Sequence, residues 1–186
     1  MHIPKKGLRA LGIAESYTGR SVSRLAGVVM RKDLRIDGFI FSTVTVGGMD
    51  ATASILHMVD ELKRKDINVI MLSGCVIAWF NIINPSQIAQ KTGIPVICVT
   101  YEDSEGLIAE IRHHFPGDNV RISAYENLGE RIPIELHTHQ TIFIRAWGLD
   151  QRDAAQLCND FTLEGKIPEP LRVARLCARH AVLSVT

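Results

Sequence analysis

The sequence contains no long apolar run, and this absence excludes a membrane-spanning helix of ordinary composition. No segment of the 186 residues approaches the roughly 20 consecutive apolar residues that are needed to cross a bilayer. The first ten residues, MHIPKKGLRA, also lack the apolar core of a secretory signal. We therefore expect a cytoplasmic protein that has no membrane partner.

An excess of charge of either sign is also missing. The chain has 21 basic and 20 acidic residues, so its formal net charge is +1. Proteins that coat nucleic acid without regard to sequence carry a strongly basic domain, and this chain does not belong to that class. Any binding of nucleic acid therefore has to depend on a few individual side chains and not on the overall charge of the protein.

Closely spaced cysteines are absent. The four cysteines, Cys75, Cys98, Cys158 and Cys177, form no CxxC pair and no zinc-finger spacing. Each falls in or beside an apolar strand or a helical pattern, so we expect all four to be buried thiols.

What is present is a regular order of apolar segments. Strands are predicted at Leu8–Tyr17, Ser23–Asp33, Leu34–Val46, Ile67–Gly74, Ile94–Glu102, Arg131–His139 and Gln140–Trp147. Helices are predicted at Asp50–Asp66, Asn84–Gly93 and Ser104–Phe115, and two more follow Asp150, separated by GKIPEP. The rest of the section from Val120 to Gly148 shows no regular pattern.

Three consecutive strands followed by α/β crossovers predict a mixed sheet with helices on both faces. The first three strands are expected to be antiparallel. This order is typical of the ribonuclease H-like fold. The length suits one domain over residues 1–186, with no repeat or linker.

Several motifs support a more specific comparison. GIAESY at the end of the first strand resembles the GVDxSY of endonuclease V. The segments DGFIFSTVTVGGMDAT, VIMLSG, FNIIN, TGIPVI and GKIPEPLRVA together resemble an archaeal family of unknown function, numbered ninety-nine, that is related to endonuclease V. The resemblance covers nearly the whole chain and implies the ribonuclease H-like fold.

The resemblance also implies where acids should lie. Endonuclease V holds its metal with carboxylates at the end of the first strand, after the third strand and at the end of the fourth. Here the first position is Ala14 and the last is Ser73, and Asp50 falls near the middle one. Glu15 follows Ala14, but successive side chains of a strand point to opposite faces, so only a bulge or an early strand end would turn it toward the site.

Three hypotheses follow. The first is a protein that binds DNA or RNA and has a degenerate metal-nuclease site at Glu15, Asp50 and Ser73, together with Ala14. The second is an active endonuclease in which Glu15 and Asp50, with Asp37 as a further acid, hold Mg²⁺ or Mn²⁺. The third is an interaction protein without nucleic acid, such as a homodimer that uses an exposed sheet edge.

Two further groups of residues are candidates for binding. Tyr17, Trp79, Phe80 and Trp147 are aromatic residues that could stack on bases. His137 and His139, two apart on a predicted strand beside Glu135, could chelate a transition metal. Core packing and a solvated strand face are the alternatives.

Overall fold

The computed structural model describes residues 7–17 and 21–183. Its strands are β1 (Arg9–Ser16), β2 (Val22–Arg31), β3 (Ile36–Thr45), β4 (Val69–Ser73), β5 (Val76–Ile77), β6 (Asn81–Ile82), β7 (Val96–Thr100), β8 (Ile132–Glu135) and β9 (Thr141–Trp147). Its helices are α1 (Ala51–Glu61), α2 (Pro85–Thr92), α3 (Ile108–His114), α4 (Asn119–Glu126), α5 (Gln151–Asp160) and α6 (Glu169–Leu183). None of the helices in these described residues is both long enough and apolar enough to span a membrane.

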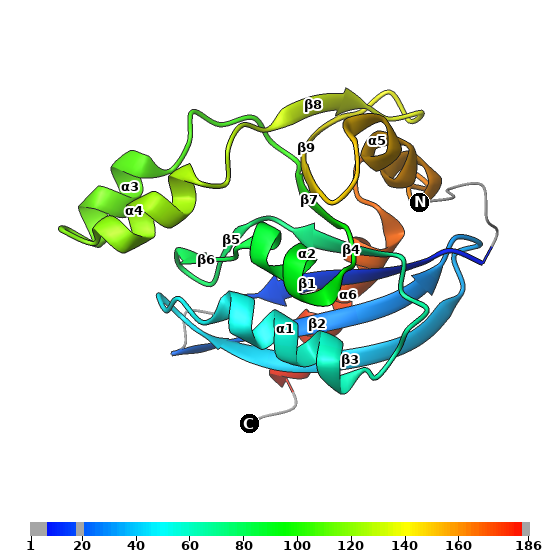
Figure 1. Cartoon of the computed structure of the whole chain (residues 1–186), viewed down its shortest axis with the longest axis horizontal. Coiled ribbons are helices and arrows are strands. Elements are labelled where there is room, and N and C mark those ends of the chain that lie inside the picture. The colour runs from blue at the N-terminus through cyan, green and yellow to red at the C-terminus, as the bar shows by residue number, and fades with distance from the viewer. Residues whose placement is uncertain (1–6, 18–20, 184–186) are drawn as a thin grey trace.

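Seven of the strands form one mixed sheet in the order β3-β2-β1-β4-β7-β9-β8 (Figure 1). β2 is antiparallel to both β1 and β3, and β4 and β7 continue the sheet parallel to β1. β9 is antiparallel to β7, and β8 is antiparallel to β9. The predicted mixed sheet with three antiparallel strands first is confirmed.

The helices cover both faces of the sheet, and the alternation along β1 shows how. Leu11 and Ile13 belong to an apolar cluster on the side of α1 and α2. Ala10 and Ala14 belong to a second cluster on the side of α5 and α6. Gly12 lets α6 approach the strand, since a Cβ at this position would lie 2.5 Å from the carbonyl carbon of Pro170. The end of β1 is therefore enclosed between two packed layers.

Two elements were not predicted from the sequence, α4 and the β5–β6 hairpin. α4 begins after Asp118, whose side chain accepts a hydrogen bond from the backbone N–H of Arg121. Its buried residue is the charged Arg121, so the helix shows no apolar stripe. β5 and β6 have two residues each, which is too short for an alternating pattern.

The helix caps were predicted with mixed success. Asn84 caps α2 by accepting from Gln87, and Gly93 ends that helix with φ +69°, as expected. The predicted cap of the next helix at Asp103 or Ser104 is wrong, because α3 starts only after Leu107.

The cysteine prediction is also wrong in part. Cys75 and Cys98 are joined as a disulfide, with their Cα atoms 6.3 Å apart. Cys158 is a free, buried thiol as predicted, and Cys177 is free but only half-buried. Cys75 lies two residues after the end of β4, and Cys98 lies on the neighbouring β7. The pairing of these strands therefore brings together residues that the sequence separates by 23 positions.

Candidate functional site

The carboxyl ends of β1, β4 and β7 meet at a cleft of about 400 Å³. Its lining includes Glu15, Ser73, Tyr101, Arg131 and Arg175. Open α/β sheets bind their ligands outside the carboxyl ends of the parallel strands. The cleft is therefore the candidate site, and it contains two of the residues that the sequence indicated.

Ala14 and Ser73 occupy the α6 face of the sheet. Ala14 is 3% exposed and packs in the apolar cluster against α6. Met71 belongs to the same cluster, so Ser73, two residues later on β4, points to this face as well. The Ser73 hydroxyl lies 3.5 Å from the Tyr101 hydroxyl. An alkyl group and two neutral hydroxyls therefore stand where the resemblance implies carboxylates.

A positive charge lies beside these hydroxyls. The guanidinium carbon of Arg175, on α6, lies 5.7 Å from the centre of the Tyr101 ring. Burial raises the pKa of Tyr101, so its phenol is protonated at neutral pH. No carboxylate among residues 7–17 and 21–183 pairs with Arg175. Glu102, which also lines the cleft, pairs with Lys166. Arg175 is therefore the charged group on this face that can attract an anion.

Glu15 points to the opposite face from Ala14. Its carboxylate accepts a hydrogen bond from the Ser23 hydroxyl at 2.5 Å and another from the backbone N–H of Ala78 at 3.3 Å. β1 and β2 stay in register as far as Glu15 and Ser16, so no bulge turns the side chain over. Both carboxylate oxygens of Glu15 therefore accept hydrogen bonds within the chain, one from a residue of β2 and one from the loop after β5.

Asp50 holds the turn between β3 and α1. Its carboxylate accepts from the Thr45 backbone N–H at 3.1 Å, from the Thr45 hydroxyl at 2.8 Å and from the Asn81 amide at 2.6 Å. Desolvation of the carboxyl raises its pKa, but the hydrogen bonds from Thr45 and Asn81 outweigh this, and the pKa lies below its ordinary value. Asp50 is therefore ionised and engaged, and it is not among the residues that line the cleft.

Arg121 supports the same turn, and sequence reasoning missed it. Its side chain is 5% exposed and donates to the carbonyls of Gly47, Gly48 and Phe80 and to the carboxylate of Asp118. The only sequence signal is Asp118 three residues earlier, a spacing that suits a pair at a helix start. Arg121 thus ties α4 to the loops beside the cleft.

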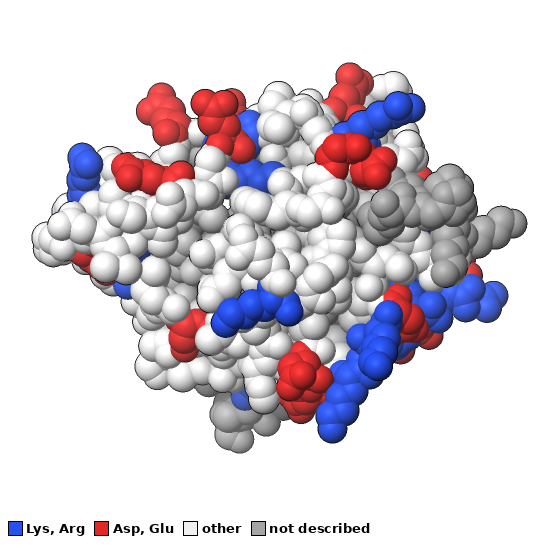
Figure 2. Space-filling model, in the orientation of Figure 1, with Lys and Arg blue, Asp and Glu red and all other residues white. Residues whose placement is uncertain are grey.

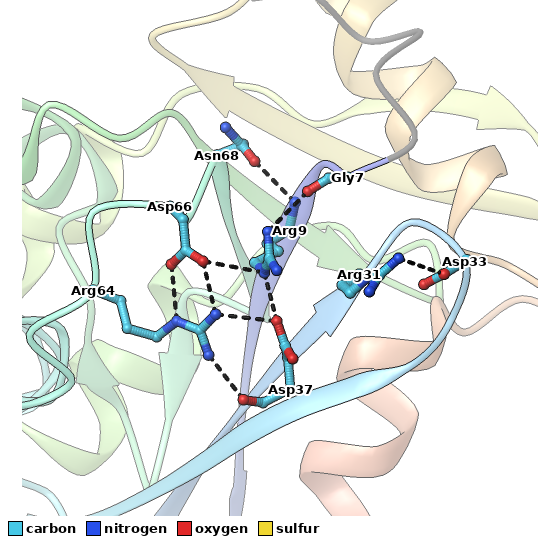
Figure 3. A network of polar contacts seen from close by, with 8 residues as sticks. All are labelled: Gly7, Arg9, Arg31, Asp33, Asp37, Arg64, Asp66 and Asn68. Carbon is cyan, nitrogen blue, oxygen red and sulfur yellow. Dashed lines mark hydrogen bonds and ion pairs between the residues drawn. The ribbon is translucent and has the colours of Figure 1, made fainter.

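Asp37 lies far from the cleft, in an ion network at the amino ends of β1, β3 and β4 (Figure 3). It pairs with Arg9 at 2.5 Å and with Arg64 at 3.0 Å, and Asp66 pairs with the same two arginines. The hypothesis that Asp37 adds an acid to the nuclease site is wrong, because Asp37 begins its strand and the site lies where the strands end.

The histidine and aromatic candidates from the sequence do not come together in one site. The structure places His137 and His139 in a turn after β8 instead of on a strand, and the ring of His137 contacts Asn159. Within the described part of the chain, no three His, Cys, Asp or Glu side chains converge as a metal site would require. Of the four aromatic candidates, Tyr17, Trp79 and Phe80 lie together, and Trp147 lines a different groove between α1, α2 and α4.

The surface charge agrees with the near-zero net charge. On the face drawn in Figure 2, basic and acidic side chains are interspersed, with no broad patch of one sign. Recognition of a charged ligand therefore has to depend on a few placed groups such as Arg175.

Comparison with known proteins confirms the resemblance. The model of a family described as Endonuclease dU matches residues 6–182. A relative from Pyrobaculum calidifontis, called a UPF0215 protein, is 39% identical over 173 aligned positions, and the match covers 90% of this chain and 93% of the relative.

Solved structures give the same fold. A protein of unknown function from Archaeoglobus fulgidus is 26% identical with a TM-score of 0.81, over 94% of this chain and 98% of that one. Endonuclease V from Ciona intestinalis, solved with a 24mer DNA containing an inosine, is 16% identical with a TM-score of 0.66, over 97% of this chain and 88% of that one. The ribonuclease H-like fold of endonuclease V is thereby confirmed.

Proposed function

Because the chain belongs to the Endonuclease dU family and has the fold of endonuclease V, we propose that it binds DNA or RNA at the strand-end cleft without metal-dependent cleavage. The observation that carries this proposal is the environment of Ser73. Two neutral hydroxyls and an arginine without a carboxylate partner in the described chain stand where a metal nuclease needs converging acids. This arrangement can hold a phosphate group.

The residues present do not fit a divalent metal. Mg²⁺ takes oxygen ligands and is usually fixed by one or two carboxylates together with substrate phosphate. Ala14 supplies no ligand atom, and Ser73 supplies no charge. Glu15 and Asp50 are acids, but their oxygens already accept hydrogen bonds from Ser23, Ala78, Thr45 and Asn81. We therefore derive no catalytic step through a metal.

The test is a salt series of anisotropy titrations with labelled single-stranded DNA, deoxyuridine- and inosine-containing DNA, and RNA. We expect binding at low salt that weakens as salt rises, because phosphate contacts release counterions. Arg175→Ala should weaken binding to all probes alike and reduce the salt slope by about 0.8, the effect of losing one phosphate contact. Arg152→Ala, at an exposed arginine on α5, is the matched control. Absence of binding at low salt to every probe would refute the proposal.

A second candidate is a metal-dependent endonuclease, which the family's description favours. In this candidate Glu15 and Asp50 would hold Mg²⁺ or Mn²⁺, and their carboxylates would have to give up the hydrogen bonds that they accept now. Incubation of each probe with either metal at high enzyme concentration decides between the two. Cleavage that is lost in both Glu15→Ala and Asp50→Ala would establish this candidate, and inertness would leave the binding function.

A second copy of the chain is a further partner that we propose. β3 is an edge strand, and its Phe39 and Phe41 are about half exposed. Unpaired edge strands offer backbone groups to another chain. Light scattering should then give the mass of a dimer, and Phe41→Lys should give a monomer. A monomeric mass at all concentrations would contradict this.

A further inference from the structure

A group of aromatic rings lies next to the cleft and is largely open to solvent. It consists of Tyr17, Trp79, Phe80, His114 and Phe115, and we call it the aromatic ledge. Tyr17 is 44% exposed and Trp79 is 45% exposed. Their rings are nearly parallel, with an interplanar angle of 22° and centroids 6.4 Å apart, and Trp79 also contacts the His114 ring at 4.8 Å.

The backbone that carries Trp79 is strained. Ala78, Trp79 and Phe80, which connect β5 to β6, have φ values of +42°, +59° and +61°. The left-handed region costs an L-residue about 1–2 kcal/mol, and such conformations persist only where the surroundings impose them. Ala78 is buried in the core and Phe80 packs against it, but Trp79 between them is exposed, so burial of apolar surface does not explain the left-handed conformation of Trp79.

Hydrogen bonds on both sides hold this loop. The N–H of Ala78 donates to the carboxylate of Glu15, and its carbonyl accepts from Gly47 at 2.8 Å. The carbonyl of Phe80 accepts from Arg121, whose guanidinium also lies 3.9 Å from the centre of the Phe115 ring. The ring of Trp79 is therefore presented by a fixed loop, and less ordering entropy is lost when a ligand stacks on it.

The ledge is continuous with the cleft and borders a basic helix end. Glu15, Val76 and Ile77 line the cleft, and Trp79 of the ledge follows Ile77 by two residues. Arg112 lies in the last turn of α3, the same turn that carries His114 of the ledge, so this helix end is basic. A ligand that is both flat and anionic matches this combination better than an apolar protein surface does.

We propose that the aromatic ledge is a stacking platform for an unpaired base of single-stranded DNA or RNA whose phosphates reach Arg175 in the cleft. This rests on the proposed binding function and extends it to the kind of strand that is bound. Stacking needs a free base face, so the ledge selects single strands over duplex.

The first test uses the fluorescence of Trp79. The chain has two tryptophans, so in a Trp147→Phe background Trp79 is the only one. Titration of this variant with oligo(dT) should quench its emission to saturation, and a duplex of equal length should quench it less. A labelled oligonucleotide followed by anisotropy reports binding independently.

The second test removes the rings. Trp79→Ala and Tyr17→Ala should each weaken binding of single-stranded oligonucleotide about 5- to 100-fold, the range for loss of one stacked base, with the salt slope unchanged. Trp79→Asn is a second variant, because asparagine tolerates the left-handed backbone and so preserves the loop. Leu163→Ala, at a residue that is 59% exposed between α5 and α6, is the control and should bind as the parent does.

The outcomes separate the two proposals. If oligonucleotides bind the parent but neither quench Trp79 nor bind Trp79→Asn more weakly, the ledge proposal is refuted and the binding function stands. If no probe binds at low salt, the proposed function fails and the ledge proposal fails with it. Quenching of Trp79 that grows with protein concentration alone, with a dimer mass in light scattering, would show that a second copy covers the ledge and would also refute it.

Discussion

The two ends of the central sheet differ in how completely their charged side chains are paired. At the amino ends of β1, β3 and β4, Arg9, Asp37, Arg64 and Asp66 form a closed network in which each charge faces an opposite one (Figure 3). At the carboxyl ends of β1, β4 and β7, Arg175 lies beside neutral hydroxyls.

This difference separates structural charge from charge that is available to a ligand. Charged groups that pair with one another at a surface stabilise the fold modestly. Their electrostatic potentials largely cancel, so they attract a charged ligand only weakly. An arginine beside neutral groups keeps its field, so the carboxyl end is the end that can attract phosphate.

Loss of Arg121 should have the largest effect on stability. Arg121→Ala leaves the carbonyls of Gly47, Gly48 and Phe80 without their donor, and we expect about 3 kcal/mol less unfolding free energy in urea denaturation. Arg9→Ala, at the other end of the sheet, should cost about 1 kcal/mol or less, because the pairs there are partly exposed. Equal losses would remove the contrast between the two ends.

Loss of the Asp50 carboxylate should have the next largest effect on stability. Asp50→Ala removes the acceptor of Thr45 and of the fully buried Asn81, and should lower the unfolding free energy by about 1–2 kcal/mol. Asp50→Asn keeps one acceptor oxygen and should lose less. Added Mg²⁺ should not raise the melting temperature of the parent chain. A rise that disappears in Asp50→Ala would favour a metal role for this acid.

Ser73→Asp would place a carboxylate near Arg175, so that the cleft would contain paired charges like those at the amino ends of the strands. The new carboxylate would neutralise Arg175 and repel phosphate, so we expect nucleic-acid affinity at low salt to fall about tenfold, which is about 1.4 kcal/mol. Ser73→Asn introduces a side chain of nearly the same shape as aspartate but without its charge, and this variant should bind nucleic acid nearly as the parent does. Unchanged binding by both variants would exclude Ser73 from the interface.

The smallest expected effect is a loss of stability at low pH, when the carboxylates in the ion network at the amino ends of the strands become protonated. The hydrogen bonds from Arg64 lower the pKa of Asp66 to about 2 from 3.8. A lowered folded-state pKa means that the unfolded chain binds more protons, so stability is present above about pH 4 and is lost as the pH falls toward 2. Asp66→Asn should flatten the dependence of unfolding free energy on pH in this window. An unchanged slope would mean that other carboxyls dominate.

The sheet could be predicted because its signals are local. The buried run from Ile67 to Leu72 and the Asn84-Pro85 start of α2 each act through neighbours in the chain. α4 escaped prediction because it buries a charged residue, and the disulfide escaped because no spacing rule joins Cys75 to Cys98.

The candidate site was predicted in part. The absence of acid at Ala14 and Ser73 could be seen in the sequence, and so could the opposite direction of Glu15, because strand periodicity fixes it. The partners of Asp50 and the place of Arg175 could not, since Asn81 and α6 reach them from distant parts of the chain.

The sequence by itself determined the succession of the main strands along the chain, because the period of neighbouring residues indicates it. The absence of two acids could be read from the sequence through its resemblance to endonuclease V. Only the tertiary structure decided which charges are paired and which remain open. The position of Arg175 beside Tyr101 and the exposure of Trp79 depend on how α6 and the β5–β6 hairpin pack against the sheet. Electrostatic and stacking interactions act through space, and distance in space is what the fold sets.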